Sequence, residues 1–182
     1  WVGTEGGLMR IQGREKKYFS LQDGLPSLNI YSLLEVRDSD GGASLLAGTR
    51  GGGLARFKGG TWTSQGKDQG LPSPSIYHLK ETRSRDGRRW LWAATFGNGI
   101  LRRSLAREDA PWEVFDDQAL PNLPSNVILR IEEDRRGLLY AMTQRGVARL
   151  RFEDPQDLAR PTSVESFSLE SGLPAPMCNF GA

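Results

Sequence analysis

The sequence has one cysteine, Cys178, and one histidine, His78, among its 182 residues. A single cysteine excludes an intrachain disulfide and a cysteine-rich zinc site. A single histidine leaves a metal site or a catalytic triad with no second histidine to use. No apolar run approaches the roughly 18 residues that span a bilayer, and no basic segment precedes an apolar one as in a signal peptide. We therefore expect no metal, no cofactor, no catalytic residue and no direct membrane insertion by this segment.

An excess of charge of one sign is also missing. Lysine and arginine number 24 against 22 aspartates and glutamates, and the basic residues are scattered along the chain. We expect no nucleic-acid partner, because such proteins gather basic residues on one face. No stretch keeps the apolar period of a helix, so fewer than about one residue in ten should be helical. The chain begins at Trp1 and not at methionine, so we expect it to be a piece of a longer protein.

Two motifs recur along the whole chain. The tripeptide Gly-Leu-Pro begins at residues 24, 70 and 172, with Asn-Leu-Pro at 122, so its leucines lie 46, 52 and 50 residues apart. The second motif has a threonine before a glycine-containing turn, at intervals of 45, 46 and 48 residues: Thr4, Thr49, Thr95 and Thr143. Because both motifs keep one period, we divide the chain into units 24–69, 70–121 and 122–171, flanked by a partial unit 1–23 and a stub 172–182.

Each complete unit has the pattern of four short strands. In the last unit these are an alternating stretch at 126–131, an apolar run at 138–141, a segment after the glycine turn at 146–151, and a more polar segment at 164–168. Polar turns separate them, and glycine supplies the positive φ that tight hairpins need. Repeated four-stranded units of this length are typical of β-propeller blades. The sequence therefore predicts an all-β fold, a β-propeller of four-stranded blades with about 3.5 blades present.

Three stretches match one known repeat most clearly: Ser125-Asn126-Val127, Glu133-Asp134-Arg135-Arg136-Gly137 and Trp1-Val2-Gly3-Thr4-Glu5-Gly6-Gly7-Leu8-Met9-Arg10. They resemble the two-component regulator propeller repeat, and the resemblance extends over essentially the whole chain. It implies a large propeller, commonly of seven blades. It also implies a periplasmic sensor domain of a bacterial hybrid histidine kinase or diguanylate cyclase, where signal transduction ends in a remote output domain. Ala94, Met142 and Asn122 depart from glycines of that repeat.

Three classes of function stay open from the sequence. The resemblance favours a non-catalytic sensor that binds a small molecule or an oligosaccharide at the mouth of the central channel. A carbohydrate-active propeller enzyme, a lyase or hydrolase, is the alternative, and a sugar hydrolase needs two carboxylates at a defined separation. The acidic residues 116–117 precede a blade junction, and the acidic residues 132–134 run into a turn. Neither run stands out as such a pair. A protein-binding scaffold is the third possibility.

We expect any small-molecule site to lie where the strands after each Leu-Pro begin. Radial blades converge there, so side chains from different units can meet and form a pocket. Amide and guanidinium groups would bind hydroxyl or carboxylate groups, and aromatic rings would stack on a sugar face. The candidates are Asn29, Tyr31, Tyr77, His78, Asn126 and Arg130. The alternative for each of them is packing, or contact with water in the channel.

An arc of three and a half blades leaves two open edges, and sheet edges have to be paired or covered. The first expectation is a fragment of a larger propeller that further blades complete. The second is a four-blade ring in which residues 175–182 supply the missing inner strand of unit 1–23. The third is a dimer in which two copies form one ring of seven blades.

Overall fold

A computed structural model describes residues 1–153, 160–175 and 178 of the protein. Its helical elements are three 3-10 segments, η1 (Leu21–Asp23), η2 (Lys67–Gln69) and η3 (Leu169–Ser171). No α-helix occurs in this part of the chain, and no helix in it is long and apolar enough to cross a membrane. The prediction of an all-β fold is confirmed.

The strands form four antiparallel sheets in which strands adjacent in the chain pair with one another. The first sheet contains β1 (Val2–Thr4), β2 (Gly7–Gln12) and β3 (Glu15–Phe19). The second contains β4 (Ile30–Arg37), β5 (Ala43–Thr49), β6 (Leu54–Lys58) and β7 (Thr61–Gln65). The third contains β8 (Ile76–Arg83), β9 (Arg89–Thr95), β10 (Ile100–Ser104) and β11 (Glu113–Phe115). The fourth contains β12 (Ile128–Glu133), β13 (Leu139–Thr143), β14 (Gly146–Phe152) and β15 (Pro161–Phe167).

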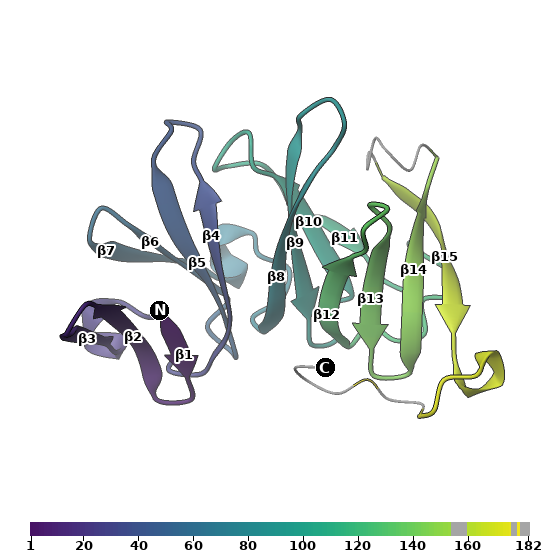
Figure 1. The fold of residues 1–182 in the computed structure, drawn as a ribbon, viewed down its shortest axis with the longest axis horizontal. Coiled ribbons are helices and arrows are strands. Elements are labelled where there is room, and N and C mark those ends of the chain that lie inside the picture. Colours follow the sequence, from purple (N-terminus) through teal and green to yellow (C-terminus); the bar gives the residue numbers. More distant parts are fainter. Residues whose placement is uncertain (154–159, 176–177, 179–182) are drawn as a thin grey trace.

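The sheets follow one another from the first, at the left of Figure 1, to the fourth, at the right. The first strands of the complete sheets gather in the middle, where β8 contacts both β4 and β12. Within the described residues the first sheet has no strand in this innermost position, since β1 matches the second strand of the other sheets. Each four-stranded sheet lies inside one of the units 24–69, 70–121 and 122–171. The unit boundaries themselves stay a prediction.

The repeated tripeptide marks a change of chain direction before each innermost strand. Its first residue has a left-handed backbone, with φ of 97° at Gly24, 80° at Gly70 and 90° at Gly172. Asn122 adopts the same conformation with φ of 78°, which asparagine tolerates better than most side chains do. The leucine that follows is buried at three of the four sites: Leu25, Leu71 and Leu123. A left-handed turn and a buried anchor thus explain why the motif recurs.

The repeated threonine closes the turn between the second and third strands of a complete sheet. Its hydroxyl donates to the carbonyl oxygen of a glycine at the far side of the turn. The pairs are Thr49 with Gly53 at 2.8 Å, Thr95 with Gly99 at 2.7 Å and Thr143 with Gly146 at 2.8 Å. All three threonines are fully buried, so this bond satisfies a hydroxyl that has no access to water.

Apolar side chains fill the spaces between neighbouring sheets. Trp92 of the third sheet is fully buried in a cluster that includes Ile131 of the fourth. Trp1 lies between the first two sheets, with its ring centre 5.5 Å from that of Phe19 and 5.3 Å from that of Phe57. The core therefore lies at the sheet interfaces, as the radial packing of a propeller requires.

Candidate functional site

The innermost strands of the three complete sheets begin with the same irregularity. A register shift interrupts the pairing near the start of β4, β8 and β12. The residue at the shift is Tyr31 in β4, Tyr77 in β8 and Leu129 in β12. A bulge of this kind re-aims the side chain of the extra residue. Two of the three bulges therefore present a tyrosine where the innermost strands converge.

We call Tyr31, Tyr77 and Phe96 the mouth aromatics, after the channel mouth at which the sequence predicts a binding site. The rings of Tyr31 and Tyr77 meet edge to face with centres 5.0 Å apart, and the Phe96 ring lies 5.6 Å from that of Tyr77. Tyr31 is 38% exposed and Phe96 is 56% exposed. Phe96 follows β9 and forms a backbone bridge to Val127, next to β12. Burial raises the pKa of Tyr77, and the neighbouring Tyr31 adds to the effect. The second and third sheets thus supply rings to one aromatic row that reaches towards the fourth.

The two asparagine candidates lie in the loops just before β4 and β12. Asn29 donates its backbone N–H to Ser27 Oγ at 3.2 Å, and its carbonyl oxygen accepts from the Arg50 N–H at 3.0 Å. The Asn126 side chain donates to Asp117 Oδ1 and accepts from the Asp117 backbone N–H, both at 2.9 Å. Asn126 therefore ties the start of the fourth sheet to the segment after β11, and its amide is engaged there.

His78 connects two neighbouring innermost strands. Its Nδ1 atom accepts a hydrogen bond from the Ile131 backbone N–H of β12 at 3.4 Å. Ser32 makes the equivalent contact one sheet earlier, because its Oγ accepts from the Leu79 N–H of β8 at 2.9 Å. Burial lowers the pKa of His78, and the Arg130 cation acts in the same direction. The neutral imidazole is therefore the form that suits this contact.

Arg130 belongs to a charged group shared by β8 and β12. Its guanidinium lies 2.6 Å from Glu132 Oε1, and Lys80 Nζ lies 3.2 Å from Glu132 Oε2. Burial raises the pKa of Glu132, but the hydrogen bonds from Arg130 and Lys80 outweigh it and leave the pKa below its ordinary value. The structure thus gives Arg130 a carboxylate partner on its own strand and places it near His78.

Three side chains of this region were not among the sequence candidates: Phe96, Lys80 and Glu132. Phe96 stands in the turn after the repeated threonine, where the neighbouring units have Arg50 and Gln144. That departure from the repeat was the available signal for Phe96. Lys80 and Glu132 had no comparable signal, because only the packing of β8 against β12 brings them together.

The acidic runs considered for a glycosidase have partners within the fold. Glu132 pairs with two cations, Asp117 binds Asn126, and Asp116 Oδ1 accepts backbone N–H groups of the turn that follows it. Across residues 1–153, 160–175 and 178, no group of three or more His, Cys, Asp or Glu side chains could hold a metal ion. Burial raises the pKa of Cys178, which disfavours the nucleophilic thiolate.

No model of a known protein family matches the chain, and no curated protein does. It does match the solved extracellular domain of BT3049 from B. thetaiotaomicron, assigned as a hybrid two-component system. The TM-score is 0.72 at 23% identity, over 97% of this chain and 22% of the other. Two structures of the extracellular domain of BT4673 from the same organism, assigned once as a one-component and once as a hybrid two-component system, match with TM-scores of 0.65 and 0.63. Both are 19% identical over 91% of this chain, and over 20% and 19% of their own length.

The chain has the fold of one part of these extracellular domains. It is a β-propeller segment with three complete four-stranded blades and one three-stranded blade, and the predicted fold class is confirmed. We call the four sheets the first to fourth blades from here on. The chain spans about a fifth of the length of the structures that it matches. None of these three structures is described as a diguanylate cyclase, the other output that the sequence resemblance implied.

Proposed function

We propose that this segment belongs to the periplasmic ligand-sensing region of a bacterial receptor of the two-component type, and that it binds its ligand without catalysis. The observation that carries the proposal is the meeting of Tyr31 and Tyr77, from two blades, with ring centres 5.0 Å apart. Binding sites form where groups from several elements converge. The fold shared with extracellular domains of signalling systems supports the periplasmic location.

The chemistry at the mouth suits a carbohydrate or a similar small polar molecule. Partly exposed rings, such as those of Tyr31 and Phe96, can cover the apolar face of a sugar. Lys80, Arg130 and Glu132 lie on the inner strands β8 and β12 and can bind hydroxyl groups with charge-assisted hydrogen bonds. The ligand class in this proposal is therefore an oligosaccharide held by stacking and by a few charged side chains.

A sensor must bind its ligand more tightly in one arrangement of its blades than in another. The side-chain contacts of Ser32 with β8 and of His78 with β12 join successive inner strands directly after the bulged residues. A ligand that bridges Tyr31 and Tyr77 would favour one spacing of β4 and β8. In our proposal the ring has seven blades, and either further blades or a second copy of the chain complete it. The preferred spacing of β4 and β8 is transmitted through this ring to a remote output domain.

A calorimetric screen against an oligosaccharide library, with product detection on the same samples, tests this function. We expect binding without turnover. Replacing a central aromatic contact should weaken binding by about tenfold, so we expect that loss for Tyr77→Ala. Tyr18→Ala is the matched control, because Tyr18 is 68% exposed on β3 of the first blade. Formation of a cleavage product would favour the enzyme instead, and unchanged affinity in Tyr77→Ala would contradict the placement at the mouth.

A further inference from the structure

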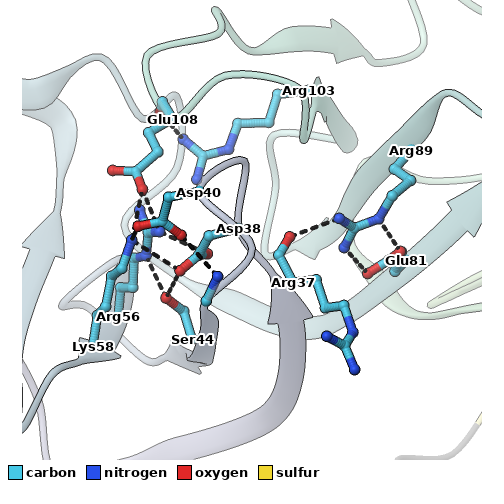
Figure 2. A network of polar contacts seen from close by, with 11 residues as sticks. Arg37, Asp38, Asp40, Ser44, Arg56, Lys58, Glu81, Arg89, Arg103 and Glu108 are labelled. Atoms are coloured by element: carbon cyan, nitrogen blue, oxygen red, sulfur yellow. Dashed lines mark hydrogen bonds and ion pairs between the residues drawn. The ribbon is translucent and has the colours of Figure 1, made fainter.

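A cleft lined by both polar and apolar side chains lies between the second and third blades, and no residue of the inner strands lines it. Its volume is about 150 Å³, well above the roughly 10–15 Å³ that a cavity needs to hold one water. The polar residues of its lining include Arg56, Thr63, Gln65, Arg103 and Glu108. Figure 2 shows Arg103 and Glu108 approaching the ion-paired side chains of the second blade.

Arg103 departs from the repeat at an otherwise apolar position. The third strand of each complete blade, and β2 of the first blade, contain an arginine at the same place: Arg10, Arg56, Arg102 and Arg149. The residue after it is Ile11, Phe57 or Leu150 in three blades, and Arg103 in the third blade. An apolar side chain suits a position between two sheets, whereas a guanidinium placed there has to leave water at a cost in free energy.

Gln65 departs from the repeat in the adjoining blade. It pairs with the first residue of β6, and the equivalent position is a phenylalanine in every other blade: Phe19, Phe115 and Phe167. The two departures touch each other. Arg103 Nη1 donates to Gln65 Oε1 at 3.0 Å, and Trp112 Nε1 donates to the same oxygen at 3.3 Å. Polar side chains thus replace apolar ones on both sides of this one blade interface.

Arg103 is a buried cation to which no carboxylate of the described residues is ion-paired. It is 8% exposed, and its guanidinium lies 4.6 Å from the ring centre of Trp112. The acceptors that it reaches, Gln65 Oε1 and the Glu108 carbonyl oxygen, are neutral. Burial, together with the Arg56 cation, lowers the pKa of Arg103 to about 10. The guanidinium therefore stays charged at neutral pH.

The neighbouring cations already have counter-ions. Arg56 lies 2.7 Å from Asp38 and 2.5 Å from Glu108, and Lys58 lies 2.6 Å from Asp40 (Figure 2). The Glu108 carboxylate is thus occupied by the second blade, and only its backbone faces Arg103 at hydrogen-bonding distance. A buried charge without a counter-ion costs free energy. An incoming anion would therefore bind more favourably to Arg103 than to Arg56 or Lys58, which already have counter-ions.

We propose that this cleft is a binding site for a small carboxylate-bearing ligand, such as a uronate, whose carboxylate pairs with the Arg103 guanidinium. The guanidinium fork can bind a carboxylate through two parallel hydrogen bonds. Thr63, Ser64 and Gln65 line the same cleft and offer hydroxyl and amide groups to the rest of the ligand. The site does not involve the mouth aromatics, so it is independent of the function proposed for the mouth.

Titration of the full chain with D-glucuronate, D-glucose and sulfate tests this site. Binding is measured by calorimetry and by the NMR signal of the Trp112 Nε1–H, assigned with Trp112→Phe. We expect D-glucuronate to bind and to shift this signal, because the indole shares the Gln65 oxygen with Arg103. D-glucose should do neither. D-glucose or sulfate binding as tightly as D-glucuronate would overturn the carboxylate assignment.

Arg103→Leu restores the residue type of the other blades and should weaken D-glucuronate binding by at least about tenfold, the usual minimum for a hydrogen-bonded charge. Arg83→Leu is the matched control, since it removes a charge from the exposed end of β8, and it should bind as the wild type does. The Trp112 signal is read in the unsubstituted protein and so does not depend on the folding of any variant at Arg103. No shift at saturating D-glucuronate, or equal binding by Arg103→Leu, would overturn the proposal.

Discussion

Replacing Gly48 by alanine tests how closely neighbouring blades pack. A Cβ atom on Gly48 would lie 2.8 Å from Ile76 Cγ2 and 3.0 Å from the Ile76 carbonyl oxygen in the next blade. Ile76 is fully buried, so it has little space into which to move. Gly3 has the same relation to Ile30, with a Cβ distance of 2.7 Å to Ile30 Cγ2. At Gly3 and Gly48 glycine is therefore needed for close approach and not for an unusual φ, whereas Ala94 and Met142 stand at this place in the third and fourth blades.

The size of the effect follows from two opposing terms. Forcing a methyl group into a packed interior destabilises a protein by about 1–3 kcal/mol. Replacing glycine by alanine also lowers the conformational entropy of the unfolded chain, which stabilises the folded state by roughly 0.4–1 kcal/mol. We expect Gly48→Ala to lower the free energy of unfolding by about 1–2 kcal/mol. For a chain of this size the Tm should fall by about 2–8 °C, which thermal unfolding followed by circular dichroism measures.

Gly6→Ala is the matched control for Gly48→Ala. Its new Cβ would have one neighbour, Thr4 Oγ1 at 3.7 Å, so the Tm should stay the same or rise slightly. Adding Ile76→Ala should cost less in the Gly48→Ala background than in the wild type, because the deleted Cγ2 is the atom in closest contact. A Tm of Gly48→Ala equal to that of the wild type would refute the close spacing of the second and third blades.

Two further substitutions test contacts near the mouth. His78→Ser should keep an acceptor for the Ile131 N–H, as Ser32 does one blade earlier. In the wild type, the lowered pKa of His78 makes its protonation costlier in the folded state than in the unfolded state. The wild type should therefore lose stability below about pH 6.5, and His78→Ser should not show this loss. Urea unfolding of both proteins at pH 7 and at about pH 5.5 measures this difference in stability. The same pH dependence in His78→Ser and in the wild type would contradict the prediction. Asn126→Ala should lower the free energy of unfolding by about 0.5–1.5 kcal/mol, since both bonds to Asp117 are lost, and the same urea assay would disprove this by showing no change.

The strand positions could be predicted from the sequence because each repeated motif has a physical task. Gly24 and Gly70 supply left-handed turns, and Thr49 and Thr95 close hairpins from buried positions. Such residues recur wherever the chain reverses, so their period marks the ends of the strands. The bulge at Tyr77 has no comparable mark, because it arises from the pairing of β8 with β9.

Contacts between blades could not be predicted from the period. A repeat aligns equivalent residues of different units, but it does not tell which of them meet across an interface. Tyr31 and Tyr77 were expected at one place and do meet there. Arg103 and Gln65 were not singled out, because their departures from apolar positions become visible only once the strand register is known. Whether the six candidate residues bind a ligand stays a prediction.

Fluorine-19 NMR of fluorotyrosine-labelled protein tests ligand binding at the mouth most directly. The chain has four tyrosines: Tyr18, Tyr31, Tyr77 and Tyr140. The titrant is the oligosaccharide that gives the largest heat in the calorimetric screen. We predict that the signals of Tyr31 and Tyr77 shift with the calorimetric affinity while those of Tyr18 and Tyr140 do not move. Shifts confined to Tyr18 or Tyr140, or none at Tyr31 and Tyr77 at saturation, would contradict recognition at the mouth.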